Sequence, residues 1–258
     1  MIDFYYAPTP NGWKVAIMLE ECGLDYTVKP ISLHDGDQFA LEFLKISPNA
    51  KMPAILDFQP AAGYGDDPLP VFESAAILLY LAEKSGQFAP PAADRRARKE
   101  LMEWLFWQTG SQGPMGGQLS HYRNYAPHDD RAYGFDRYLG EYERTMAVLE
   151  NRLRDRPHLL GDTYTIADMQ AFPWAFIAKP LGSSLERFPN VAGWRERLKS
   201  RPAVRRAIDL MKDRQNRGEN MRTVENDSQT FNQNADRLLA LGERLETAAT
   251  GSDGSQGD

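Results

Sequence analysis

The first third of the chain alternates short apolar runs with stretches of helical period. Ile2–Tyr6 is a β-branched and aromatic run, and the two prolines of the following Ala7-Pro8-Thr9-Pro10 stretch exclude a helix there. From Asn11 the apolar residues return at helical spacing, and Gly23 stands where that helix should end. This pattern predicts a strand, a turn and then a helix.

The same alternation continues to about residue 85. Further strands are expected at residues 26–31 and 54–56, and a brief fourth strand should follow the Gly-, Asp- and Pro-rich loop 59–70. Helical spacing predicts a short helix over residues 38–46 and a longer one over residues 74–84. The order β-α-β-α-β-β-α indicates a small α/β domain, for which we take residues 1–88.

Beyond the predicted linker Ala89-Pro90-Pro91, strand-like alternation disappears. Helical patterns cover residues 94–110, 132–153, 165–177 and 191–200, with further helix to about 214, so residues 89–217 should form an all-helical domain. Residues 218–258 are a polar tail that ends in GSDGSQGD, a composition that cannot form a packed core. Within this tail Ala235, Leu238, Leu239 and Leu245 predict one amphipathic helix.

Composition narrows the class of protein. With 42% hydrophobic and 26% charged residues among 258, the chain is an ordinary globular one, and a net charge of −6 disfavours a nucleic-acid binder. The single cysteine, Cys22, excludes a disulfide within the chain, a Cys-x-x-Cys pair and a cysteine-based zinc site. No apolar run approaches the ~18–20 residues that span a bilayer, and the N-terminus lacks the layout of a signal peptide. We therefore expect a cytoplasmic protein with no membrane partner.

The turn at residues 7–11 is the first candidate for chemistry. Free backbone N–H groups and the positive end of a helix dipole meet there, and Thr9 and Asn11 add a hydroxyl and an amide donor. Such a place stabilises an anion, and a thiolate is one candidate. The alternative is that Thr9 or Asn11 merely caps the helix.

Two later motifs are weaker when taken alone. In Lys51-Met52-Pro53 the proline either opens a strand or forms a cis bond, which would leave the Met52 backbone free to pair with an extended peptide. Ser74 is a good N-cap, but the same helix N-terminus could instead hold a ligand carboxylate while Glu73 accepts from a ligand ammonium.

Several other motifs have a structural interpretation. Thr165 and Asp168 form a capping box, and the aromatic run of residues 104–107 is mostly core. Cys22 lies on the inward side of its helix, too far along for the dipole to activate it. The histidines lack the spacing of a metal site or a catalytic triad, and we predict no metal; they are His34, His121, His128 and His158.

Together and in this order, five sequence blocks resemble glutathione transferases over about residues 1–214. The resemblance is strongest to the bacterial Nu class, the disulfide-bond oxidoreductases related to Ure2-like proteins. It implies an α/β thioredoxin-like N-terminal domain followed by an all-α C-terminal domain. The blocks are YAPTPNGWKV (6–15), EFLKISPNAKMPAI (42–55), FESAAILLYLAEKSG (72–86), EWLFWQTGSQGPMGGQ (103–118) and YTIAD (164–168).

The resemblance also implies residue roles. Thr9 and Asn11 would contact the glutathione sulfur and act as the catalytic residues. The backbone of Met52, ahead of a cis Pro53, would pair with the cysteinyl unit, and Glu73 and Ser74 would hold the γ-glutamyl end. Further contacts with glutathione would come from Gln38, from Lys51 and, in the helical domain, from Arg137.

The activity that the resemblance implies is glutathione-dependent disulfide reduction by a homodimer. Because the chain has no catalytic cysteine, bound glutathione, reduced or as its disulfide, supplies the sulfur; weak transferase or peroxidase activity would accompany this. One alternative is transfer to, or thioether cleavage of, aromatic electrophiles, with Trp107, Met115 and Tyr122 as an apolar wall. Another is a regulatory module that binds glutathione without turnover. The loop after Asp57 and the tail from Gly218 depart from the family pattern, and the tail could fold over the cleft or the dimer.

Overall fold

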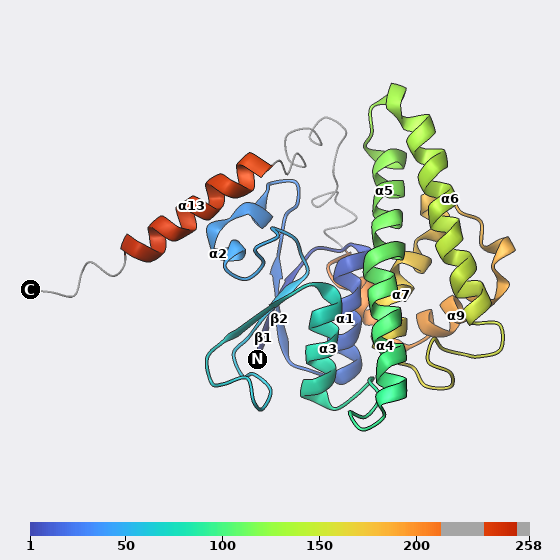
Figure 1. Ribbon diagram of the computed structural model, residues 1–258, viewed down its shortest axis with the longest axis horizontal. Helices are drawn as coiled ribbons and strands as arrows, with labels where there is room; N and C mark the ends of the chain where they lie inside the picture. Colours follow the sequence, from blue (N-terminus) through green and yellow to red (C-terminus); the bar gives the residue numbers. More distant parts are fainter. Residues whose placement is uncertain (213–234, 252–258) are drawn as a thin grey trace, which may run out of the picture.

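The computed structural model describes residues 1–212 and 235–251 and contains a four-stranded sheet followed by a helical body (Figure 1). The strand order is β2-β1-β3-β4. β1 (Ile2–Tyr6) pairs in parallel with β2 (Tyr26–Pro30) and antiparallel with β3 (Ala54–Asp57). β4 (Leu69–Phe72) completes the sheet by pairing antiparallel with β3.

Alternation along β1 assigns its side chains to two different cores, as expected of a strand that is covered on both faces. Phe4 and Tyr6 are fully buried in the main core, together with residues of α1 (Pro10–Cys22) and α3 (Ser74–Ser85). Tyr5 faces the other side, where its ring centroid lies 5.5 Å from that of Phe43 in α2 (Leu41–Leu44).

The helical body begins with α4 (Arg95–Trp107), which continues through the π-helical segment Gln108–Gln112 into α5 (Gly113–Asn124). α6 (His128–Arg152) packs against α5, and α7 (Ile166–Phe176) is buried at the centre. The remaining elements of the body are α8 (Ala178–Leu181), η3 (Leu185–Arg187), α9 (Pro189–Lys199) and α10 (Pro202–Asp209). The predicted fold class, an α/β thioredoxin-like domain followed by an all-α domain, is confirmed.

α13 (Ala235–Gly251) lies beside the α2 side of the sheet domain, away from the helical body (Figure 1). The amphipathic helix predicted in the tail is therefore present. Residues 213–234, which include the end of the helix predicted to about residue 214 and the domain boundary predicted at 217, lie outside the described part of the chain. None of the described helices combines the length and apolarity needed to cross a bilayer.

Two predictions of local structure are wrong. The single helix expected over residues 38–46 is a 3₁₀ turn, η1 (Asp37–Phe39), and a separate α2, because the backbone of Ala40 between them is extended (φ −62°, ψ 136°). Residues 113–124, which were not predicted as a helix, form α5. Pro114 stands in the first turn of α5, where a proline is tolerated.

Candidate functional site

A cavity of about 700 Å³ opens between the sheet domain and the helical body. One wall comes from the N-terminal turn of α1, the segment 47–53 and the start of α3; the other comes from residues 108–125 and Trp174. All but one of the predicted site residues line this cavity: Thr9, Asn11, Gln38, Lys51, Met52, Pro53, Glu73 and Ser74.

Thr9 occupies the N-cap of α1. Its backbone is extended, and its Oγ1 accepts a hydrogen bond from the Gly12 N–H at 3.2 Å. A hydroxyl that accepts in this way keeps its own hydrogen to donate. Thr9 therefore caps the helix and can also offer a donor to an anion in the cavity. The two roles that the sequence presented as alternatives, helix cap and anion donor, are compatible.

The orientation of Asn11 is set from the helical body. Trp174 Nε1 donates to Asn11 Oδ1 at 3.0 Å. Since the indole is only a donor, the amide oxygen is the engaged atom, and Asn11 offers a ligand its Nδ2 donors. Trp174 in turn lies directly against Gly116 of α5, where an added Cβ would stand 2.5 Å from the indole.

The segment before β3 carries the second predicted motif, and the Met52-Pro53 bond is cis. The β3 ladder begins at Ala54, so the backbone of Met52 lies beyond it, beside the cavity. Met52 Sδ accepts from the Ala7 N–H at 3.1 Å, which ties this segment to the turn of α1. Gln38, on η1, is 2% exposed, and its Oε1 has no hydrogen-bond partner in the described structure.

The prediction that Ser74 caps α3 is wrong. The N-cap position is Glu73, which has a left-handed φ of 68° and makes no side-chain cap bond. A non-glycine residue at such a φ costs on the order of 1–3 kcal/mol and is typical of functional sites. Ser74 is the first helical residue, and its Oγ accepts from Gln170 Nε2 at 3.2 Å and from Lys14 Nζ at 3.4 Å.

Lys14 lies behind Ser74 in a buried polar cluster. Its Nζ donates to Gln108 Oε1 at 2.8 Å, and Gln170 Nε2 donates to the same oxygen at 2.8 Å. Burial lowers the pKa of Lys14 to about 7, opposed by the charge of Glu73. A lysine in this position responds to negative charge placed near Ser74, because an anion there favours its protonated form.

The apolar wall differs from the prediction. Trp107, Met115 and Tyr122 do not line the cavity. The ring of Trp107 packs edge-on to Trp104, and that of Tyr122 stacks on Tyr138. α5 instead presents to the cavity one face with helical spacing, made of Pro114, Gly117, Gln118 and His121. Tyr125, which follows α5, and Trp174 of α7 complete this wall.

Comparison with known proteins gives the family. Residues 9–84 match the glutathione S-transferase N-terminal domain, and residues 132–197 match the glutathione S-transferase C-terminal domain. Disulfide-bond oxidoreductase YfcG of Escherichia coli is 47% identical over 208 residues, which cover 81% of this chain and 94% of that protein. This chain belongs to the glutathione S-transferase family. Disulfide-bond oxidoreductase YghU, also of Escherichia coli, is 39% identical and covers 80% of this chain and 73% of its own.

Solved glutathione transferases share the fold. One from Burkholderia graminis, with two glutathione molecules per subunit, has a TM-score of 0.75 and 42% identity and covers 82% of this chain and 88% of its own. One from Pseudomonas putida, with one glutathione disulfide per subunit, has a TM-score of 0.73 and 38% identity. The match covers 81% of this chain and 91% of that one. The match therefore extends to proteins whose sites hold glutathione in either redox state.

Two residues lie away from the cavity of this glutathione transferase. Arg137 is on α6, where its exposed guanidinium lies 3.6 Å from a carboxylate oxygen of Glu141. Cys22 ends α1, with its Sγ 3.4 Å from Ser85 Oγ, and burial raises its pKa. In residues 1–212 and 235–251 no group of three or more metal-ligating side chains is found.

Sequence reasoning missed the cluster around Lys14. One signal was present, because Lys14 interrupts the otherwise apolar run from Trp13 to Leu19, all of which is buried. An ionisable residue in such a run needs a partner. Gln108 and Gln170 gave no comparable signal, because they lie within the helices predicted over residues 94–110 and 165–177, where a glutamine is ordinary.

Proposed function

We propose that this glutathione transferase is a glutathione-dependent disulfide reductase. The supporting observation is the pair of donors at the start of α1, Thr9 and Asn11, beside a cavity that contains no protein thiol. Cys22, the only cysteine of the chain, is elsewhere and has a raised pKa. The sulfur chemistry then belongs to the ligand, as the names of YfcG and YghU also suggest.

In this proposal glutathione lies along the cavity wall. Its sulfur meets Thr9 Oγ1 and Asn11 Nδ2, and its cysteinyl unit pairs with the backbone of Met52 ahead of Pro53. The γ-glutamyl end reaches Glu73 and Ser74. Gln38 and Lys51 contact the peptide. The contact of Arg137 with a glutathione carboxylate stays a prediction from the resemblance, because its guanidinium lies outside this cavity, beside Glu141.

The donors at α1 lower the pKa of the bound thiol, which is near 8.5 in a free cysteine, and so raise the thiolate fraction at neutral pH. The thiolate attacks one sulfur of the substrate disulfide, that bond breaks, and the departing thiolate takes up a proton. A second glutathione thiolate then attacks the mixed disulfide. One disulfide and two glutathiones give two thiols and one glutathione disulfide, so no protein cysteine is consumed.

Within the family, we assign this protein to the Nu class and propose that it is a homodimer in the cytoplasm. A cytoplasmic location suits the reaction, because the reduced glutathione pool there drives disulfides toward thiols. The proposed homodimer has its own support. The exposed rings of Phe72 on the edge strand β4 and of Phe106 on α4 are apolar surface that an interface between two copies of this chain would cover. The sedimentation velocity of the full chain tests the dimer.

A second candidate is conjugation to, or thioether cleavage of, an aromatic electrophile, which the rings of Tyr125 and Trp174 in the cavity wall favour. Side-by-side assays decide between them: reduction of 2-hydroxyethyl disulfide, conjugation of 1-chloro-2,4-dinitrobenzene, and glutathione binding by calorimetry. We expect reduction to dominate and to survive Cys22→Ala nearly unchanged. A large loss in that variant contradicts the bound-thiol mechanism, and binding without either turnover indicates a regulatory module.

A further inference from the structure

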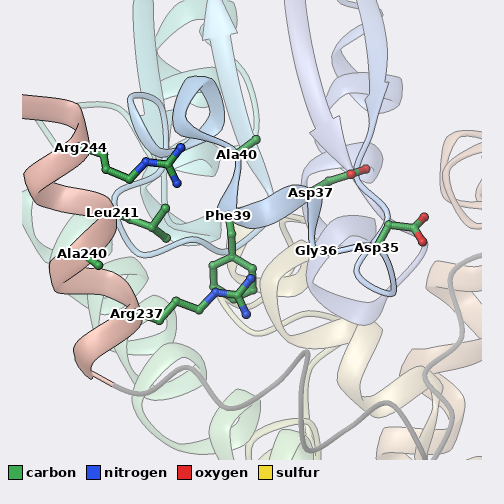
Figure 2. A pocket seen from close by; sticks show the side chains of 9 residues that line it. All are labelled: Asp35, Gly36, Asp37, Phe39, Ala40, Arg237, Ala240, Leu241 and Arg244. Carbon is green, nitrogen blue, oxygen red and sulfur yellow. The ribbon is translucent and has the colours of Figure 1, made fainter. Parts of the chain in front are cut away.

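The α13 helix packs against residues next to those that line the cavity, although it is outside both matched family domains. The second of these ends at residue 197, and α13 begins at Ala235. Leu241 packs in a small core that is separate from the main one and includes Phe39, Leu44 and Ala50. The guanidinium carbon of Arg237 lies 3.6 Å from the centroid of the Phe39 ring (Figure 2).

The partner of α13 is the 3₁₀ turn that carries Gln38. Phe39 follows Gln38 directly in η1, and successive side chains of a 3₁₀ helix point about 120° apart. One of the two therefore faces α13 while the other lines the cavity. A change in how Phe39 packs on α13 can therefore reach Gln38 through the backbone of this three-residue turn.

A second backbone segment of the site touches the same helix. Ala50 shares the small core with Leu241, is 1% exposed, and has a left-handed φ of 52°. It directly precedes Lys51 and Met52, which line the cavity. α13 thus contacts the chain next to two separate groups of proposed glutathione contacts.

Local hydrogen bonds between Ser32 and Asp37 hold the start of the turn, whereas the Phe39 side chain at its end depends on tertiary packing. η1 has three residues and α2 has four, and helices this short are marginal without tertiary contacts. The contact with α13 is therefore made by packing and by the cation over the ring: Figure 2 shows Arg237 at the Phe39 ring, whereas the carboxylates of Asp35 and Asp37 point away from α13 and accept hydrogen bonds from Ser32.

We propose that α13 is a positioning element of the glutathione site, in which Arg237 and Leu241 hold Phe39 and thereby fix Gln38 for the ligand. This rests on the proposed function. Because Gln38 and the sulfur donors Thr9 and Asn11 come from different elements, losing the contact weakens glutathione binding and leaves the chemical step intact.

The test compares two leucines of the same helix in the full chain. Leu241 is 9% exposed, whereas Leu239 is 65% exposed and serves as the matched control. Leu241→Ala is expected to weaken glutathione binding ~5-fold, the worth of about one hydrogen bond, with KM raised alike and kcat at saturating glutathione unchanged. Leu239→Ala should match the wild type in glutathione affinity, KM and kcat.

Arg237 supplies an independent variant pair. Arg237→Ala should weaken binding, and Arg237→Lys, which keeps a cation over the ring, should restore most of it. Hydrogen exchange of residues 36–44 without ligand should accelerate in Leu241→Ala and Arg237→Ala but not in Leu239→Ala. Equal affinities in Leu241→Ala and Leu239→Ala overturn the positioning role, even if exchange changes. A wild type that binds no glutathione overturns the proposed function and this proposal with it.

Discussion

At the scale of single residues, the site depends on atoms that make more than one contact. Thr9 Oγ1 accepts from the Gly12 N–H and is left with a hydrogen to donate, so helix capping orients the donor that we propose for the glutathione sulfur. Asn11 Oδ1 is engaged by Trp174, which leaves its Nδ2 for the ligand. Folding contacts thereby prepare both donors before glutathione arrives.

Thr9→Ala is expected to lower kcat/KM for disulfide reduction by ~5- to 10-fold, because one hydrogen bond of ~1 kcal/mol to the sulfur is lost. Thr9→Ser keeps the hydroxyl and should retain most of the rate. Loss of the cap costs ~1 kcal/mol of stability as well, so thermal melts of both variants must accompany the kinetics. An unchanged rate in Thr9→Ala means that Asn11 or the backbone holds the sulfur.

The buried amine of Lys14 makes stability depend on pH. Its pKa is about 7 in the folded protein against 10.5 as the ordinary value, so between these values the unfolded chain binds the extra proton and folding stability rises with pH. Below about pH 7 both states are protonated, and the folded protein bears the full cost of a buried charge. The slope approaches 1.4 kcal/mol per pH unit inside that window.

Lys14→Met is therefore expected to be more stable than the wild type at pH 7 and to lose that advantage steadily toward pH 10. Gln108 Oε1 keeps a donor in this variant, from Gln170 Nε2. Urea midpoints of both proteins, measured without ligand from pH 6.5 to 9.5, check this. Parallel curves for the two proteins would mean that Lys14 titrates normally.

Local motifs were enough to predict which residues lie together. Thr9, Asn11, Met52 and Ser74 stand in ordered sequence blocks and line one cavity, while their roles toward glutathione stay predictions. Residue-level prediction failed where tertiary contacts decide: the left-handed φ of Glu73 displaces the cap expected at Ser74, and no pattern in a single sequence reports that backbone angle.

At the scale of elements, α5 is the helix that sequence patterns disfavour most. It contains Gly113, Gly116 and Gly117 beside Pro114, residues that are poor in a helix interior. Gly116 explains part of this composition, because the Trp174 indole occupies the space of a side chain there. The composition of α5 thus reflects packing and cavity shape, neither of which helical periodicity encodes.

Gly116→Ala is expected to displace Trp174 and with it the hydrogen bond to Asn11, lowering both stability and kcat/KM. The added Cβ would stand 2.5 Å from a ring atom, so the indole must move. Gly140→Ala in α6 is the matched control, because no atom lies within 4 Å of its added Cβ, and it should stabilise the protein by ~0.5–1 kcal/mol.

Thermal melts and steady-state kinetics of both glycine variants check this. Full activity in Gly116→Ala would mean that Trp174 does not set the orientation of Asn11.

At the scale of the whole molecule, α1 joins the two domains. Its run from Trp13 to Leu19 is buried because one side packs on the sheet and α3 while the other packs on α7 and α10. Arg201 extends this interface from the helical body: Nη2 donates to Glu21 Oε2 at 2.9 Å, and the guanidinium carbon lies 4.1 Å from the Tyr164 ring centroid. Periodicity marked α1 as helical, but burial on both sides follows only from the assembled domains.

Because the two domains share α1, we expect one cooperative unfolding transition. Ile55→Ala in β3 and Leu149→Ala in α6 remove fully buried side chains from opposite ends of the main core, at ~2–5 kcal/mol each. Each should lower the urea midpoint of the whole chain, with far-ultraviolet circular dichroism and tryptophan fluorescence still coinciding. Of the five tryptophans only Trp13 lies in the sheet domain, so fluorescence follows mainly the helical body. Separation of the two probes in Ile55→Ala would show that the helical body folds without the sheet.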